Sequence, residues 1–428
     1  MTTATNPASS APSNLPSSAP SSAPERTGPD IPALVVLAGC TVALMTFGPR
    51  SAFGLFQLDM LADRGWDRST FGLAVALQNL MWGAGQPFFG AIADKHGTWR
   101  VLALSAVLYA SGLYLTAVAD APIWLHVGGG VLVGLGIAAG SFSIVMAAFA
   151  RRVPPEARVI VFGMGTAAGS AGMFVFTPLA QGLIDAYGWS DALVVLSAIM
   201  LLIPLVALPL RGDPRGNAGA AVEFEQSIAE ALREALRSQS YLLLTAGFFV
   251  CGFQVAFITA HFPAYIGDKG LAPVWAVWGL MLIGFFNIIG SLASGLIGQR
   301  YSKPYFLALI YLGRSALVTW FLLVPISPTT VIVFAALMGL LWLSTVAPTN
   351  ALVATFFGTR YLGMLGGLVF FSHQIGSFLG VWLGGVLYDR TGSYDVVWWL
   401  GVGLGLFAAV VHWPIREEAV VRPAPGTA

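Results

Sequence analysis

Long apolar runs alternate with short polar segments along most of the chain. Twelve of these runs reach about 18 residues or more and are bounded by charges or turn residues, so each can cross a bilayer as a helix. The pattern therefore predicts an all-α membrane protein with twelve transmembrane helices. The runs cover residues 33–58, 71–93, 101–119, 124–148, 159–184, 192–210, 241–266, 273–298, 305–323, 330–356, 362–387 and 396–413.

One long polar segment, from Arg211 to Ser240, divides the twelve runs into six and six. Within it, residues 223–237 have helical spacing and predict a short surface helix. The first residues of the chain are rich in Ser, Pro and Ala, a composition typical of disorder. The expected parts are a disordered tail (1–30), a six-helix bundle (31–211), a cytoplasmic linker (212–240), a second six-helix bundle (241–414) and a C-terminal tail (415–428).

The two halves of the chain repeat one another at a nearly constant distance. A spacing this steady over several helices predicts two homologous, pseudo-symmetric bundles, with a binding cavity between them near the midplane of the membrane. The repeated residues are Gly48, Ala52 and Phe53 with Gly252, Ala256 and Phe257 at a spacing of 204, Gly90 with Gly295 at 205, and Asp185 with Asp389 at 204.

Composition narrows the class of protein. The chain is 57% hydrophobic and only 10% charged, which excludes an ordinary soluble domain. A formal net charge of +1 gives no basis for binding nucleic acid. The two cysteines, Cys40 and Cys251, lie inside apolar runs and predict neither a disulfide framework nor a metal site. We expect no metal and no other cofactor, and a monomer in the lipid bilayer.

The distribution of basic residues predicts the orientation in the membrane. An even number of spans places both termini on one side, and that side holds fifteen Lys and Arg residues against four on the other. Positive residues are retained on the cytoplasmic side. We therefore expect a multi-pass protein of the cell inner membrane with both termini in the cytoplasm.

Arg50 places a permanent positive charge inside the first apolar run, about eight residues or ~12 Å from its far end. An Arg near the centre of a membrane helix costs roughly 2.5–3.5 kcal/mol. All 20 Asp and Glu fall in tails, loops or helix ends, so no acid is at hand to neutralise it. A ligand can bring the missing negative charge. The alternatives are a side chain that snorkels to the interface, pairs with a carbonyl or sits in a hydrated cavity.

The loop after the second run, Gly90-Ala-Ile-Ala-Asp94-Lys95-His96-Gly97-Thr-Trp-Arg100, resembles the signature G-x-x-x-D-[RK]-x-G-x-x-[RK] of the major facilitator superfamily. In this loop, Gly90 allows close helix approach, Asp94 can cap a helix, Gly97 suits a turn and Arg100 adds positive charge on the inside. The resemblance implies a conformational motif that latches the two bundles during alternating access. Its residues here are Gly90, Asp94, Lys95, Gly97 and Arg100.

Within the superfamily the chain is similar to the branch of monocarboxylate transporters and oxalate/formate exchangers. In that branch a cation after a proline in the first helix contacts the substrate carboxylate, which implies this role for Arg50 in Pro49-Arg50-Ser51. His373 stands where the exchangers carry a lysine. The chain departs from the animal carriers in the eighth helix, because Asn287 and Ser291 replace an Asp and an Arg, so the usual carboxylate for proton coupling is absent.

Several polar residues inside the apolar runs complete the candidate site. Their amides and imidazoles can hydrogen-bond a substrate carboxylate or hydroxyl. A contact between helices is the competing interpretation for each of them, and a scaffold contact is our interpretation of Arg314. The candidate substrate-binding residues are Arg50, His373, Gln374, Gln254, Asn287 and His261.

These observations favour a secondary transporter that moves small monocarboxylates or related organic anions by alternating access. Proton symport, with a histidine or the substrate acid carrying the proton, and exchange of one anion for another both stay open. The alternatives are an exporter of an amphipathic metabolite or drug and, from another class, a membrane signalling scaffold. An intramembrane enzyme would need a nucleophile and base or a metal cluster, and neither is evident, so we expect no enzymatic activity.

Overall fold

The computed structural model is helical throughout the residues that it describes, with no strand in any of them. The expected disordered tail, most of the expected linker and the end of the C-terminal tail lie outside these residues. The described ranges are 32–154, 158–211, 227–358 and 361–420.

The first half of the chain supplies six membrane segments, three of them interrupted by short 3-10 or π turns or by a break. In chain order these segments are α1 (Ala33–Ala52) with η1 (Phe53–Phe56) and α2 (Gln57–Arg64); α3 (Arg68–His96); α4 (Thr98–Ala117); α5 (Pro122–Leu125) with η2 (His126–Leu132), α6 (Val133–Ala139) and α7 (Phe142–Arg152); α8 (Arg158–Tyr187); and α9 (Trp189–Met200) with α10 (Ile203–Val206) and η4 (Leu208–Leu210).

The second half begins with the surface helix α11 (Ile228–Arg237), which covers the described part of the predicted helix at 223–237. A capping box at Ser227 and Glu230 satisfies its first backbone donors. The six membrane segments that follow are α12 (Gln239–Asp268), α13 (Pro273–Arg300), α14 (Lys303–Leu323), α15 (Pro328–Leu341) with α16 (Val346–Phe357), α17 (Leu362–Thr391) and α18 (Asp395–His412).

Length and hydropathy agree with the predicted number of spans. Within the described ranges, eleven helical segments are long and apolar enough to cross a membrane. The one predicted span that does not meet this criterion is α3, the second in chain order. It has 29 residues and is more polar than the others because it carries Gln78, Asn79 and Gln86. The most polar membrane helix therefore also carries three candidate hydrogen-bonding side chains.

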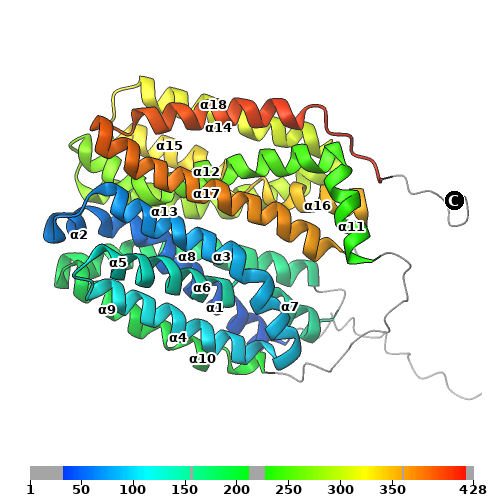
Figure 1. The fold of residues 1–428 in the computed structure, drawn as a ribbon, viewed down its shortest axis with the longest axis horizontal. Helices are drawn as coiled ribbons and strands as arrows, with labels where there is room; N and C mark the ends of the chain where they lie inside the picture. Colours follow the sequence, from blue (N-terminus) through cyan, green and yellow to red (C-terminus); the bar gives the residue numbers. More distant parts are fainter. Residues whose placement is uncertain (1–31, 155–157, 212–226, 359–360, 421–428) are drawn as a thin grey trace, which may run out of the picture.

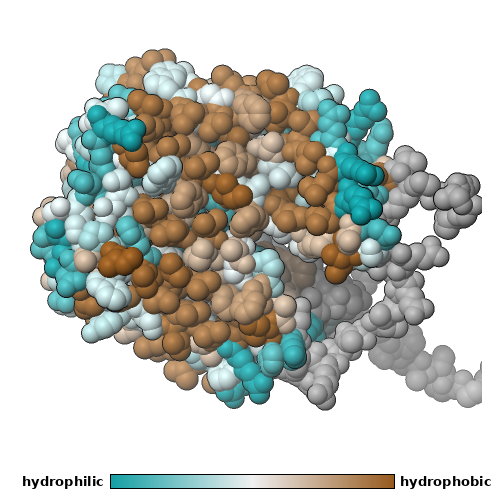
Figure 2. Space-filling model, viewed as in Figure 1, coloured by the Kyte–Doolittle hydropathy of each residue, from teal (hydrophilic) through white to brown (hydrophobic). Residues whose placement is uncertain are grey.

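The two halves form two helical layers that face each other (Figure 1). The main contacts between them join α3 to α17 and α8 to α13. Figure 2 shows apolar side chains over the middle of the visible face and hydrophilic ones at its two ends, as expected for a molecule that spans a bilayer. The predicted architecture of two six-helix bundles is confirmed, whereas the boundaries at residues 211 and 241 stay a prediction.

Close helix contacts repeat in the two halves, as the sequence repeat predicts. A Cβ atom on Gly48 would come within 2.1 Å of Phe176 on α8. One on its counterpart Gly252 would come within 1.8 Å of the carbonyl oxygen of His373 on α17. The helix pairs α1–α8 and α12–α17 thus take equivalent places in the two bundles, and each depends on a glycine at the same register.

The first membrane segment changes from an α-helix to a 3-10 helix where it meets the opposite bundle. Pro49 lies inside α1 and cannot donate a backbone hydrogen bond, and the helix tightens into η1 soon after it. A Cβ atom on Gly54 would lie 2.5 Å from the carbonyl oxygen of Thr259 on α12. Only glycine allows this approach, which brings the backbone next to Arg50 against the second half of the chain.

Candidate functional site

Arg50 points toward α3 of its own bundle and meets no carboxylate among the residues that the structure describes. One Nη atom donates a hydrogen bond of 2.7 Å to Oδ1 of Asn79. The Asn79 amide is oriented by its own bond of 2.8 Å from Nδ2 to the carbonyl of Val75. The guanidinium carbon lies 4.7 Å from the centre of the Trp82 ring, a cation–π contact. These neighbours stabilise the charge but do not neutralise it.

The Nε–H of Arg50 is buried and has no hydrogen-bond partner within the described ranges. Beside it lies a cavity of about 10 Å³, room for roughly one water molecule. The cavity walls come from both halves of the chain, so it lies between the bundles near Arg50. They consist of Arg50, Phe53, Gly54, Val75, Gln78, Asn79, Ala256, Thr259 and Ala260.

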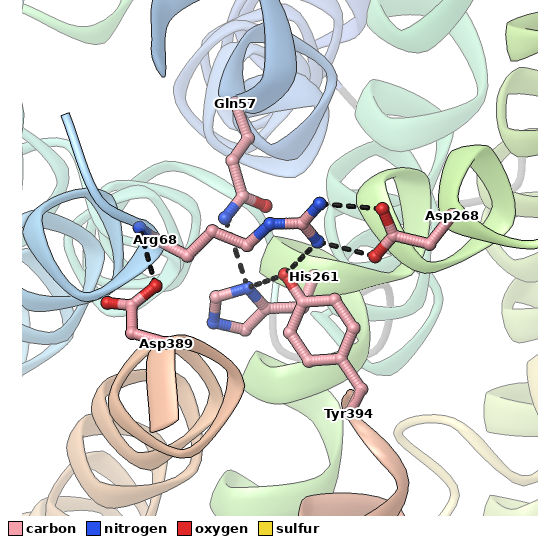
Figure 3. Close-up of polar contacts among 6 residues, drawn as sticks. All are labelled: Gln57, Arg68, His261, Asp268, Asp389 and Tyr394. Atoms are coloured by element: carbon pink, nitrogen blue, oxygen red, sulfur yellow. Dashed lines mark hydrogen bonds and ion pairs between the residues drawn. The ribbon is translucent and has the colours of Figure 1, made fainter. Parts of the chain in front are cut away.

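A polar network that we call the outer gate joins the two bundles at the end where α3 begins (Figure 3). Its name follows the orientation predicted from the basic residues. Arg68 donates from two guanidinium nitrogens to both carboxylate oxygens of Asp268, at 2.6 Å each, and donates to the Tyr394 hydroxyl at 2.9 Å. The outer gate consists of Gln57, Arg68, His261, Asp268, Asp389 and Tyr394.

Asp389 of α17 caps the first turn of α3 from the opposite bundle. Its two carboxylate oxygens accept the backbone N–H groups of Arg68 at 3.1 Å and Ser69 at 2.8 Å. The first N–H groups of a helix lack partners within the helix, and a negative charge there also favours the helix dipole. The outer end of α3 is therefore tied to the second bundle through its backbone as well as through its side chains.

His261 lies fully buried within this network. Its Nε2 is 2.9 Å from the carbonyl oxygen of Val381, which can only accept, so Nε2 carries the proton. Nδ1 then accepts, and it lies 3.2 Å from the hydroxyl of Tyr394 and 3.4 Å from Nε2 of Gln57. This arrangement fits the neutral imidazole, because a proton on Nδ1 would face the Gln57 amide donor.

Two of the predicted site residues, Gln254 and Asn287, form hydrogen bonds to other helices and do not line the small cavity. Gln254, which stands 204 residues after Arg50, donates to the carbonyl of Gly401 at 2.8 Å and accepts from Arg314 at 3.4 Å, both inside its own bundle. Asn287 donates to Ser170 of the first bundle at 2.9 Å and accepts the N–H of Leu343 at 3.0 Å. In this conformation both amides are engaged in contacts between helices, the competing interpretation of the sequence.

His373 and Gln374 lie side by side on α17 and have unused hydrogen-bonding atoms. The His373 ring stacks on Phe370 with 5.8 Å between ring centres, and its Nδ1 has no partner among the described residues. Gln374 is fully buried, and neither its amide nitrogen nor its oxygen is paired within the same ranges. Of the six predicted substrate-binding residues, Arg50 alone lines the small cavity, and His261 adjoins it through Ala260.

The conformational motif is only partly as predicted. Gly97 ends α3 with a φ of 91°, a turn conformation that suits glycine, and Lys95 and Arg100 are exposed. A Cβ atom on Gly90 would meet nothing within 4 Å, so Gly90 makes no close helix approach in this conformation, and its part in the motif stays a prediction. The side chain of Asp94 lies outside the described residues.

The ion pair of the outer gate, between Arg68 and Asp268, escaped the sequence reasoning. One signal was available for the gate, since Arg68 is among the few basic residues on the side that the positive-inside rule leaves poor in charge. No local signal links it to Asp268, because the two residues lie 200 positions apart. Arg314 is confirmed as a contact between helices, with bonds to the carbonyl oxygens of Leu341 and Trp342.

Known proteins resemble the chain over most of its length. It is 27% identical over 382 residues to the uncharacterized MFS-type transporter YcxA of Bacillus subtilis, across 87% of this chain and 92% of that protein. It is 25% identical over 416 residues to monocarboxylate transporter 13 of Rattus norvegicus, across 92% of this chain and 94% of that protein. Both alignments include the two halves of the chain.

Solved structures share the fold at low sequence identity. A D-xylose-proton symporter superposes with a TM-score of 0.70 at 14% identity, across 91% of this chain and all of that one. A mutant of the nucleoside transporter NupG superposes with a TM-score of 0.70 at 12% identity, across 89% of this chain and 98% of that one. A family model described as Major Facilitator Superfamily matches residues 37–381. The chain therefore belongs to the major facilitator superfamily of membrane transporters.

Proposed function

We propose that this chain carries small monocarboxylates or closely related organic anions across the membrane by alternating access, with Arg50 as the carboxylate ligand. The observation that carries the proposal is the uncompensated guanidinium between the bundles. It contacts an amide and an aromatic face, and the described part of the chain offers it no carboxylate. The monocarboxylate transporters among its relatives support the same class of substrate.

The chemistry of Arg50 suits an acid better than a neutral or cationic solute. A guanidinium can bind both oxygens of a carboxylate through two parallel hydrogen bonds. Its Nε–H has no partner among the described residues, and the nearby cavity is lined by residues of both bundles. Because removal of a charge from water is costly unless it is paired, a bound carboxylate would stabilise the site more than any neutral ligand of similar size.

Alternating access requires that the outer gate opens and closes. The gate is closed here through Arg68 and Asp268, and the cavity at Arg50 is too small for an organic acid. Substrate entry from the outer side thus requires separation of α3 from α12 and α17. Binding energy from a carboxylate on Arg50 can favour one arrangement over the other only if the two arrangements bind it unequally.

Replacement of Arg50 tests this function. In proteoliposomes supplied with labelled acetate, lactate or benzoate, Arg50→Ala should reduce uptake by roughly 30-fold or more, because loss of one partner of a buried charge pair costs about 2 kcal/mol or more. Uptake by Arg50→Lys should lie between that of the parent and that of Arg50→Ala, since lysine keeps the charge but loses the bidentate geometry. Arg300→Ala, at an exposed position, is the matched control. Full uptake by correctly inserted Arg50→Ala protein would exclude the proposal.

His261 is the residue that we expect to bind the coupled proton. Its Nδ1 faces Tyr394 and Gln57, and the same network contains the charged residues Arg68, which donates to Tyr394, and Asp389, which accepts the N–H of Arg68. A proton on Nδ1 would turn an acceptor into a donor opposite the Gln57 amide and loosen the outer gate, so acid outside should favour opening. His261→Gln should therefore abolish the stimulation of acid uptake by an inward proton gradient. Unchanged stimulation would instead place the proton on the substrate.

A further inference from the structure

A row of aromatic rings leads away from Arg50 and crosses from one bundle to the other. The guanidinium lies against Trp82 of α3, and the Trp82 ring meets Phe370 of α17 edge to face, with 5.1 Å between centres and 72° between planes. Phe47 of α1 also packs against Trp82, with 5.5 Å between ring centres. The contact between Trp82 and Phe370 is one that must break when the bundles separate.

Buried hydrogen-bonding groups without partners lie along the same row. The Trp82 side chain is 7% exposed, and its Nε1–H has no partner among the described residues. Gln374 is 0% exposed, and both ends of its amide are unused within those residues. Gln374 packs over Gly83, the neighbour of Trp82, because a Cβ atom on Gly83 would lie 2.8 Å from Cβ of Gln374. Arg50, Trp82 and Gln374 thus form one strip at the bundle interface.

Buried polar groups in folded proteins are nearly always satisfied, and groups left without a partner call for an explanation. Here the unpaired groups lie beside the proposed carboxylate ligand and on both faces of an interface that opens and closes. A short acid such as acetate would satisfy Arg50 and leave the indole N–H and the glutamine amide unpaired. A larger acid with a second polar group would satisfy Arg50 and at least one of the other two groups.

We propose that Trp82, Phe370 and Gln374 receive the body of the substrate, and that the substrate is a monocarboxylate with a planar aromatic body and a second hydrogen-bonding group. This inference rests on the proposed function, because the carboxylate is placed on Arg50. The ring inserts between Trp82 and Phe370, where aromatic pairs favour stacked or edge-to-face contacts. A ring hydroxyl bonds the Gln374 amide or accepts the indole N–H of Trp82.

Selectivity should follow from these contacts in two separate ways. A site that is built to hydrogen-bond a substrate group discriminates strongly against analogues that lack the group, because its own polar atoms are then left unpaired. Gln374 should therefore select for the hydroxyl. Trp82 and Phe370 should select for a flat ring over a puckered one of equal size.

Four labelled acids separate these contributions in proteoliposomes: 4-hydroxybenzoate, benzoate, cyclohexanecarboxylate and acetate. We expect kcat/KM for 4-hydroxybenzoate to exceed that for acetate by at least 100-fold. Gln374→Leu should lower uptake of 4-hydroxybenzoate at least 10-fold and leave benzoate unchanged. Trp82→Leu should abolish the preference for benzoate over cyclohexanecarboxylate. Trp399→Leu, an exposed tryptophan on α18, is the control, and gel filtration verifies folding.

The outcomes distinguish this inference from the proposed function. If acetate or cyclohexanecarboxylate is transported as well as 4-hydroxybenzoate, the inference is overturned and the proposed function stands. The inference also fails if Gln374→Leu lowers uptake of all four acids by the same factor, because the residue then supports the fold and not the hydroxyl. Absence of uptake for every acid would overturn both proposals.

Discussion

At the scale of single residues, Asn79 determines how Arg50 is presented. Its amide oxygen lies where a carboxylate would form an ion pair, and its amide nitrogen is held by the Val75 carbonyl, so the oxygen is aimed at the guanidinium. An amide oxygen accepts a hydrogen bond without cancelling the charge. The residue thereby orients Arg50 and leaves its charge available to a ligand.

Asn79→Asp should therefore inhibit the carrier. The new carboxylate would occupy a position 2.7 Å from the guanidinium and compete with the substrate for it. We expect uptake of benzoate to fall about tenfold or more, which corresponds to ~1.4 kcal/mol of lost binding. Asn79→Gln keeps the amide and serves as the control for the change in packing. Equal uptake by the two variants would mean that the charge of Arg50 is not used by the substrate.

At the scale of elements, the tenth membrane segment is interrupted. Buried side chains donate hydrogen bonds to the backbone carbonyl groups that lose their helical partners at the break. α15 ends at Leu341 and α16 begins at Val346. Arg314 of α14 donates to the carbonyl of Leu341 at 3.1 Å and 2.6 Å. A cation at this position also complements the negative end of the α15 dipole. This explains how an arginine that is 1% exposed is accommodated without an ion pair among the described residues.

Arg314→Met should lower stability, because two carbonyl groups at the break would remain buried without donors. An unsatisfied buried polar group costs roughly 1–3 kcal/mol, so we expect a loss of about 2 kcal/mol or more. Thermal unfolding of the purified protein in detergent would measure it as a lower Tm. The exposed Arg300→Met variant provides the comparison. An unchanged Tm would show that water replaces the guanidinium at the break.

At the scale of the whole molecule, the sequence repeat relates the two bundles. Only one of the two equivalent aspartates, Asp389, takes part in the outer gate. Asp389 caps α3 across the interface. Its counterpart Asp185 instead accepts from Gln181 on its own helix at 2.8 Å. The helix that corresponds to α3 is α13, which begins with Pro273, and proline has no N–H to donate. The position equivalent to Arg68 therefore offers neither a backbone N–H nor a guanidinium, and the gate is asymmetric.

Asp268→Asn should shift the carrier toward states with an open outer side, since it removes the charge that pairs with Arg68. A cysteine at Thr259, on the wall of the cavity, would report this opening. After replacement of Cys40 and Cys251 by Ala, it should react several-fold faster with an impermeant maleimide in Asp268→Asn protein than in the parent. Asp63→Asn, at a more exposed outer position, should leave the rate unchanged. Equal rates in all three proteins would exclude the gate.

Much of the fold was predictable from the sequence because hydropathy, charge and repeats are local or additive properties. Apolar length alone places twelve helices, and the steady repeat predicts two bundles. The exception among the spans, α3, is less apolar because it carries polar residues, and two of them, Asn79 and Gln78, line the cavity beside Arg50. The position of Arg50 between the bundles was likewise predictable, because its charge was uncompensated in the sequence.

The partners of each polar side chain depended on tertiary structure. Arg50 and Gln254 hold equivalent positions in the repeat and each is bonded inside its own bundle, yet only Arg50 also lines the cavity between the bundles. Arg68 and Asp268 meet only because two helices from different halves come together at the same depth. The sequence by itself thus determined which segments enter the membrane and which charge lacks a partner. Only the packing of whole helices, which sets their rotation and depth, decided which side chains face one another.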